Sequence, residues 1–106
     1  FTDDVYVDVT DDVGTADGIR QGRDRFVDGV MRMLEGVVTV HHGHMPELHI
    51  TGEDTATGIW AMEDRLDWPD GRVTTGAGHY EEEYRRVGGE WKISRMRLAR
   101  LRVETR

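Results

Sequence analysis

The chain has 106 residues, of which 37% are hydrophobic and 33% charged, and its formal net charge is −7. This length and composition predict one globular domain over residues 1–106 with a single small core, rather than a disordered chain. The acidic balance argues against a nucleic-acid partner, because phosphate binding needs a basic face. No apolar run approaches the ~20 residues of a membrane-spanning helix, so we expect no membrane partner.

The sequence contains no cysteine, which excludes disulfides, zinc–thiolate sites and thiol nucleophiles. The chain opens with the polar Thr2-Asp3-Asp4 instead of the basic and then apolar stretch of a signal peptide. Both features fit a reducing compartment, and we expect a cytoplasmic protein.

The first third of the chain predicts one strand and one helix. Valines alternate with polar residues over 5–9, the period of a half-buried strand, and the Asp- and Gly-rich residues 11–18 indicate a loop. Apolar residues recur at helical spacing over 22–34, and Gly36 is expected to end that helix.

The rest of the chain predicts a sheet. Pro46 interrupts the first β-rich stretch, and Trp68-Pro69-Asp70-Gly71 and Gly88-Gly89 are hairpin turns. About five or six antiparallel strands and one covering helix predict an α+β fold, with a curved sheet around one internal pocket. The expected strands after the helix are residues 37–45, 48–51, 55–68, 72–87 and 91–103.

Three titratable side chains are the candidates for general acid–base catalysis. His41 shares a face with Thr39, and Asp64 lies on the face of the next long strand that carries Trp60 and Met62. An imidazole beside a carboxylate in an apolar pocket can exchange protons near neutral pH. His79 lies early on the following strand, after two glycines, and it is the third candidate.

The histidines also allow a metal site to be considered. His42-Gly43-His44 places two imidazoles on one face of a strand, and Glu47 follows, which resembles part of the cupin pattern. The spacing to Glu47 is one residue short, the second cupin motif is absent, and Pro46 separates the residues. We therefore expect no metal and no cofactor.

Other conspicuous residues have simpler interpretations. Trp91 opens the last strand and is expected in the core, and at least two of the three acidic residues 81–83 are expected to be solvated. The late arginines are interpreted as the solvent face of a strand: Arg95, Arg97, Arg100, Arg102 and Arg106.

Taken together, the motifs resemble the SnoaL-like proteins of the nuclear transport factor 2-like superfamily over essentially the whole chain. The residues that carry the resemblance are Phe1-Thr2-Asp3-Asp4-Val5, Gly22-Arg23-Asp24, Thr39 to Glu47, Asp54 to Asp64, Gly78-His79-Tyr80 and Gly89-Glu90-Trp91-Lys92-Ile93. The resemblance implies a cone-shaped sheet around one apolar cavity, and a homodimer. Relatives include polyketide cyclases, steroid isomerases and dehydratases, which usually need no cofactor.

The resemblance also implies roles for individual residues. Thr39-Val40-His41 looks like the segment that carries a catalytic histidine, which makes His41 the general acid–base. Asp64 would orient it or act as the second base, and His79 would donate a hydrogen bond to a substrate oxygen. The expected substrate-binding residues are Trp60, Met62 and Tyr80 in the apolar walls and Tyr6 near the mouth.

Two functions follow as expectations. The first is a lyase or isomerase that acts on a polycyclic or steroid-like carbonyl compound. The second is a non-catalytic module of the same fold that binds an apolar small molecule or a protein partner. Relatives begin with one or two further helices before the segment that matches residues 1–4, so we expect the chain to be a fragment, a processed product or a version completed by a partner chain. If those helices are truly absent, the pocket would be open to water.

Overall fold

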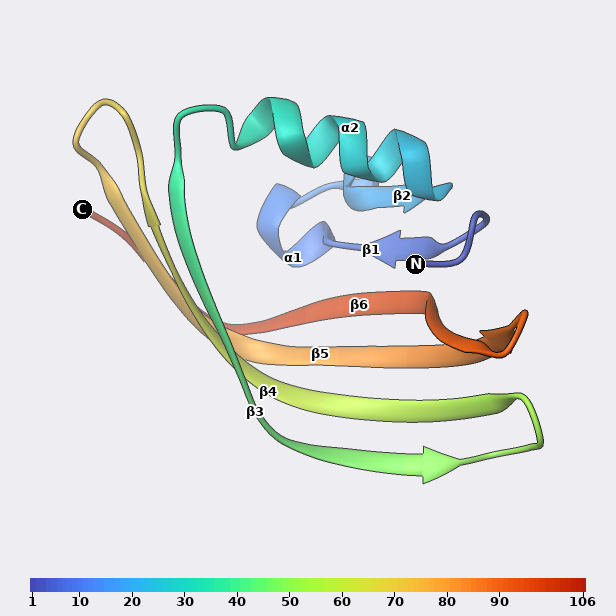
Figure 1. Cartoon of the computed structure of the whole chain (residues 1–106). Helices are drawn as coiled ribbons and strands as arrows, with labels where there is room; N and C mark the ends of the chain where they lie inside the picture. The colour runs from blue at the N-terminus through green and yellow to red at the C-terminus, as the bar shows by residue number, and fades with distance from the viewer.

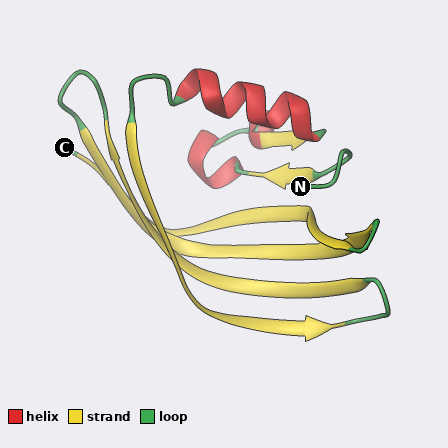
Figure 2. Cartoon of the chain, viewed as in Figure 1, coloured by secondary structure: helices red, strands yellow, loops and turns green.

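A strongly curved six-stranded sheet forms most of the molecule in the computed structural model, which describes residues 1–106 (Figures 1 and 2). The prediction of an α+β fold with a curved sheet is confirmed. The elements in chain order are β1 (Tyr6–Asp8), α1 (Thr10–Val13), the 3-10 helix η1 (Ala16–Gly18), β2 (Ile19–Gln21), α2 (Arg23–Met33), β3 (Val38–Ile50), β4 (Thr55–Asp67), β5 (Val73–Val87) and β6 (Glu90–Thr105).

The long strands β3 to β6 form an antiparallel meander, and the strand order of the whole sheet is β2-β1-β6-β5-β4-β3. We predicted antiparallel strands, but β1 pairs with β6 in parallel, so the sheet is mixed. The segment expected as a loop also contains α1 and η1, and the short strand β2 follows it. Local hydrogen bonds, such as Asp8 Oδ1 accepting from Thr10 N–H, favour a helical turn that apolar periodicity does not reveal.

The two β-rich segments on either side of Pro46 are one strand with a bulge. Met45 and Pro46 together lie opposite Trp60, and Met45 has a φ of 41°. The extra residue reverses the alternation, so Leu48 and Ile50 face the same side of the sheet as His41. The bulge therefore completes one continuous apolar side of β3, which simple alternation would have divided between two faces.

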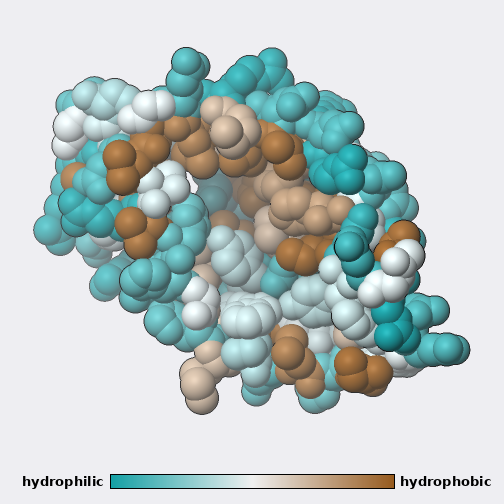
Figure 3. Space-filling model, in the orientation of Figure 1, coloured by the Kyte–Doolittle hydropathy of each residue, from teal (hydrophilic) through white to brown (hydrophobic).

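The predicted helix forms as α2, which ends at Met33 with Leu34 as its C-cap, and Gly36, expected to end the helix, has a φ of 74° in the turn that follows. No residue of α2 is buried, although the ring of Phe26 stacks edge-on against Phe1 at 5.6 Å. The helix lies across the concave side of the sheet without close packing against its long strands (Figure 1). The space-filling view shows a hollow there, with apolar residues on its rim (Figure 3).

The core is small, since only 10 of 106 residues are buried. Its apolar members are Val5, Val7, Ala56, Met62 and Leu98. The buried residues of the long strands include Met62 and Asp64 on the concave face, whereas Leu48 and Ile50 on the same face are exposed. Neither helix combines the length and apolar character that a membrane crossing requires.

Candidate functional site

His41 and Asp64 are brought together on the concave face, because they are direct cross-strand partners on β3 and β4. His41 Nε2 lies 3.7 Å from Asp64 Oδ2. This separation is too long for a hydrogen bond but suits an ion pair when the imidazole is protonated. The His41 side chain is 44% exposed and that of Asp64 only 3%, so His41 is the member of the pair that a ligand can touch.

Arg100 on β6 forms a bidentate salt bridge with the carboxylate of Asp64. Its Nη1 and Nη2 donate to Oδ1 and Oδ2 of Asp64, both at 2.9 Å. Its Nε also donates to Oδ1 of Asp12 in α1 at 2.7 Å. A buried bidentate salt bridge fixes the orientation of the carboxylate, because separating the two groups would leave an uncompensated buried charge, at a cost of about 3–5 kcal/mol.

The charges in this cluster are unequal. Burial by itself would lower the pKa of Arg100, but its hydrogen bonds with Asp64 and Asp12 outweigh burial and raise that pKa above its ordinary value. Asp11 also accepts a hydrogen bond, from the backbone N–H of Arg100, so carboxylates outnumber the guanidinium in the cluster beside His41. A positive charge on His41 would be attracted to the cluster.

Arg100 is the residue that the sequence interpretation misplaced. Arg97 lies on the convex face, as expected, and pairs there with Glu81. The side chain of Arg100, in contrast, is only 11% exposed. The cause is a bulge at Leu101, because Ala77 pairs with Arg102 whereas Gly78 pairs with Arg100. The bulge changes the facing of the arginines on either side, and no turn residue marks it.

A glycine makes room for the buried pair. A Cβ at Gly76 would lie 2.5 Å from Arg100 Nη1 and 2.8 Å from Asp64 Oδ1, closer than side-chain carbons approach such atoms. Glycine at this position therefore permits the close approach of the buried pair to the backbone of β5.

An apolar groove of about 410 Å³ lies on the same face, towards the hairpin ends of the strands. Its residues are Leu48, Ile50, Ala56, Trp60, Glu82, Tyr84, Trp91 and Ile93. The volume falls within the ~300–1,000 Å³ typical of small-molecule sites. Trp91, expected in the core, instead lines this groove and is 45% exposed.

The polar atoms of the groove form a short chain. Trp60 Nε1 donates to Tyr84 Oη at 2.9 Å, and Tyr84 Oη donates to Glu82 Oε1 at 3.2 Å. Burial raises the pKa of Glu82 above its ordinary value, although the hydrogen bond from Tyr84 acts in the opposite direction. Burial likewise raises the pKa of Tyr84. Alternation from Tyr84 would have identified Glu82 as the inward-facing acid.

The predicted wall residues share the face of Asp64. Trp60 pairs with Tyr80 across β4 and β5, and Met62 lies between Trp60 and Asp64 along the strand. Met62 is 3% exposed, and its sulfur lies 3.7 Å from Arg100 Nη1, so it supports the cluster from within the core. Burial, and then the negative charge of Asp64, raises the pKa of Tyr80.

Two predicted site residues lie elsewhere. His79 pairs with Ala61 on the convex face, opposite to that of its neighbour Tyr80, so it does not join His41 and Asp64. Tyr6 pairs with Arg95, whose guanidinium lies 4.4 Å from the centre of its ring, and this contact is also on the convex face. Strict alternation along β5 would have placed His79 and Tyr80 on opposite faces of the sheet, but the preceding glycines made it unclear from the sequence which face each side chain takes.

A second hollow of about 410 Å³ lies on the convex face and is mostly polar. Its residues are Glu47, His49, Thr57, Gly58, Ile59, Glu81, Glu82, Glu83, Arg95 and Arg97. In place of the expected single internal pocket, these two hollows are open and lie on opposite faces, and the concave one is the apolar one of the two.

The fold is shared with several solved structures. A hexachlorocyclohexane dehydrochlorinase, LinA type 2, is 20% identical with a TM-score of 0.83, covering 100% of this chain and 70% of that chain. A candidate scytalone dehydratase from Novosphingobium aromaticivorans is 19% identical with a TM-score of 0.84, covering 98% and 68%. A protein from Kribbella flavida is 21% identical with a TM-score of 0.83, covering 97% and 73%.

At these identities the structural likeness shows a common fold. The family is shown by the sequence itself, because the model of the SnoaL-like domain matches residues 1–97. The curved sheet, its open concave face and this match lead to one conclusion: the chain belongs to the SnoaL-like domain family.

Proposed function

We propose that this domain is a cofactor-independent lyase or isomerase that moves protons on an apolar, fused-ring carbonyl compound. The observation that carries the proposal is a half-exposed His41 beside a buried, Arg100-bound Asp64, on the face that also holds the apolar groove. Two similar structures bear names of elimination enzymes, a dehydrochlorinase and a candidate dehydratase, which supports the same class.

The roles follow from exposure and charge. His41, as the neutral base, takes a proton from the carbon next to the substrate carbonyl, and the electron pair of that C–H bond moves into an enolate. Asp64 stays behind His41 and balances the positive charge that the imidazole gains, while Arg100 keeps the carboxylate in place. The imidazolium then returns the proton, either to another carbon in an isomerisation or to a departing hydroxyl in a dehydration.

The groove and the proton-transfer pair lie within reach of one fused-ring ligand. A Cβ at Gly43 would be 3.4 Å from the ring of Trp60, so the ring lies over that glycine. Gly43 is two residues from His41 on β3, a separation of about 7 Å along a strand. A flat ligand stacked on Trp60 would therefore extend towards His41.

Deuterium incorporation tests the proposed proton abstraction directly. We expect the protein in D₂O to accelerate exchange of the α-protons of 2-tetralone, a fused-ring ketone, above the buffer rate measured by NMR. His41→Ala should remove that acceleration, by a factor of about 10² or more for loss of a general base. His49→Ala, which changes an exposed histidine on the convex face, should leave the rate unchanged.

A non-catalytic binding module is the second candidate, and the open groove together with the lack of a hydrogen bond between His41 and Asp64 favours it. Quenching of the tryptophan fluorescence of the protein by 2-tetralone without any acceleration of exchange would support this candidate. Equal exchange rates for the wild type and His41→Ala would remove His41 from the mechanism.

A further inference from the structure

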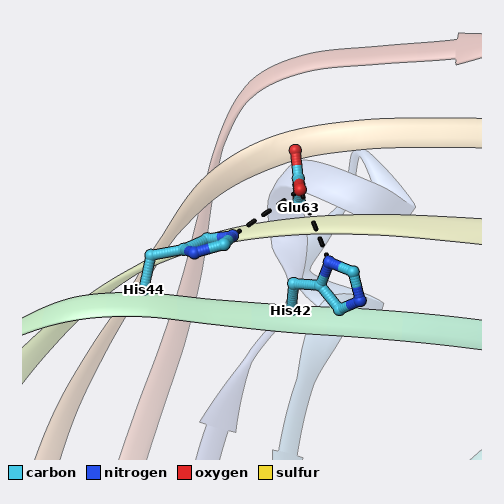
Figure 4. Close-up of side chains that lie close together, drawn as sticks. All are labelled: His42, His44 and Glu63. Carbon is cyan, nitrogen blue, oxygen red and sulfur yellow. Dashed lines mark ion pairs between the residues drawn. The ribbon is translucent and has the colours of Figure 1, made fainter.

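We propose that His42, His44 and Glu63 form a binding site for a divalent transition-metal ion, with zinc as the reference ion, on the convex face of the sheet. His42 and His44 are two residues apart on β3 and therefore point to the same side. Glu63 is the direct cross-strand partner of His42 on β4. The three side chains converge in Figure 4.

The donor atoms already have nearly the spacing of a metal's ligands. Glu63 Oε1 lies 3.5 Å from His42 Nδ1 and 3.6 Å from His44 Nε2. All three ligand atoms lie within 4.8 Å of one another. Ligands at ~2.0–2.2 Å from a tetrahedral zinc ion are about 3.4 Å apart, so small side-chain movements would close the site.

The chemistry of the donors fits the same class of ion. Two imidazoles and one carboxylate suit zinc and neighbouring transition metals, and three protein ligands leave one position for water. The adjoining positions on this face are Ala61, opposite His44, and Ala77, opposite Glu63, whose short side chains leave the fourth position accessible.

Nearby positive charge is already neutralised. Arg65, two residues from Glu63 on the same face, donates to both carboxylate oxygens of Asp67 at 3.0 and 2.8 Å. Arg102, opposite Ala77, lies 3.8 Å from Glu104. The acidic balance of the whole chain also favours a cation.

The third ligand differs from the one that the sequence suggested. Glu47 lies beyond the Met45–Pro46 bulge, opposite Ile59, whereas Glu63 comes from the neighbouring strand. Sequence spacing along β3 alone therefore identified the two histidines but not their carboxylate partner, which only the β3–β4 register supplies.

The proposed metal site is separate from the proton-transfer pair, but it lies on neighbouring residues of the same two strands. His41 and Asp64 form the adjacent cross-strand pair, with their side chains on the other face. β3 is the edge strand of the sheet, so a bound ion would join the edge to β4 at the position of His41. Zinc should therefore raise the melting temperature of the protein as it binds the folded state.

Calorimetric titration of the metal-free protein with zinc chloride tests the proposal. We expect one ion per chain, and His44→Ala and Glu63→Gln should each weaken binding by more than ~10-fold, since even outer-shell partners change metal affinity 10–100-fold. His49→Ala is the matched control on the same strand and should bind zinc as the wild type does.

Cobalt provides an independent readout, because its visible absorption reports nitrogen and oxygen ligands directly. The three side chains are more than half exposed, so the variants should keep the fold, which circular dichroism checks. Zinc binding that survives in both His44→Ala and Glu63→Gln, or no binding by the wild type, would overturn the site. The deuterium-exchange rate of His44→Ala should remain that of the wild type, which separates this result from the fate of the proposed function.

Discussion

Asp64 and Glu82 are both carboxylates on the concave face, but their surroundings differ in kind. Asp64 is more deeply buried, yet Arg100 supplies two hydrogen bonds and a full positive charge. Glu82 lies among apolar groove residues and has only the hydroxyl of Tyr84 as partner. Burial without a cation favours the protonated acid, so Glu82 is the side chain whose charge opposes folding.

Replacement of Glu82 by Gln should stabilise the protein at neutral pH. The pKa of Glu82 in the folded protein is raised above its ordinary value of 4.5. Between pH 4.5 and the raised pKa, the folded protein therefore holds a proton that the unfolded chain has lost, and the free energy of unfolding falls as the pH rises through that window. Glu82→Gln removes this loss. Its advantage in melting temperature over the wild type should be small below pH 4.5 and larger at about pH 7.

The exposed neighbour Glu83 provides the control for this measurement. Glu83→Gln should show no such growth of the difference with pH. If the melting temperatures of the wild type and Glu82→Gln differed by the same amount at every pH, the carboxyl of Glu82 would be solvated rather than embedded in the groove.

At the scale of the elements, two of the sheet's three bulges set the facing of the side chains discussed here. The one at Met45–Pro46 turns Leu48 and Ile50 inward, and the one at Leu101 places Arg100 and Arg102 on opposite faces. Both act by inserting one residue, which reverses the alternation beyond it. The site is thus a product of strand register as much as of residue type.

The same bulges explain what could be predicted from the sequence. His41 and Asp64 lie on regular stretches of β3 and β4, and their shared face followed from alternation and from the family resemblance. Arg100 could not be placed, because an unmarked bulge in a strand without Pro or Gly leaves no local signal. The placement of His79 was wrong for the related reason that two glycines weaken the pattern of alternation.

Gly76→Ala tests whether the space on β5 is needed for the buried pair. The added Cβ would meet Arg100 Nη1 and Asp64 Oδ1, so the pair must separate or shift, and we expect a loss of about 1–3 kcal/mol in the free energy of unfolding. Denaturation by urea measures this change.

Gly29→Ala is the matched control, because no atom lies within 4 Å of a Cβ built at that helical position. It should instead stabilise the chain by roughly 0.5–1 kcal/mol, the usual preference for Ala over Gly in a helix. Equal effects of the two substitutions would show that the pair is not confined by Gly76.

At the scale of the whole molecule, the central feature is a curved sheet with an open apolar groove on its concave face. Few residues are buried, and α2 spans the hollow instead of sealing it. The concave face carries the apolar groove and the His41–Asp64 pair, while the convex face carries the polar hollow and the histidine cluster. This division assigns different chemistry to the two sides of one sheet.

The position of a bound ketone tests this account most directly. A crystal structure with 2-tetralone should show the fused rings against Trp60 on the concave face, with the α-carbon about 3–3.5 Å from His41 Nε2, the distance of a reactive arrangement. A ketone bound on the convex face, or held in the groove with its α-carbon out of reach of His41, would contradict it.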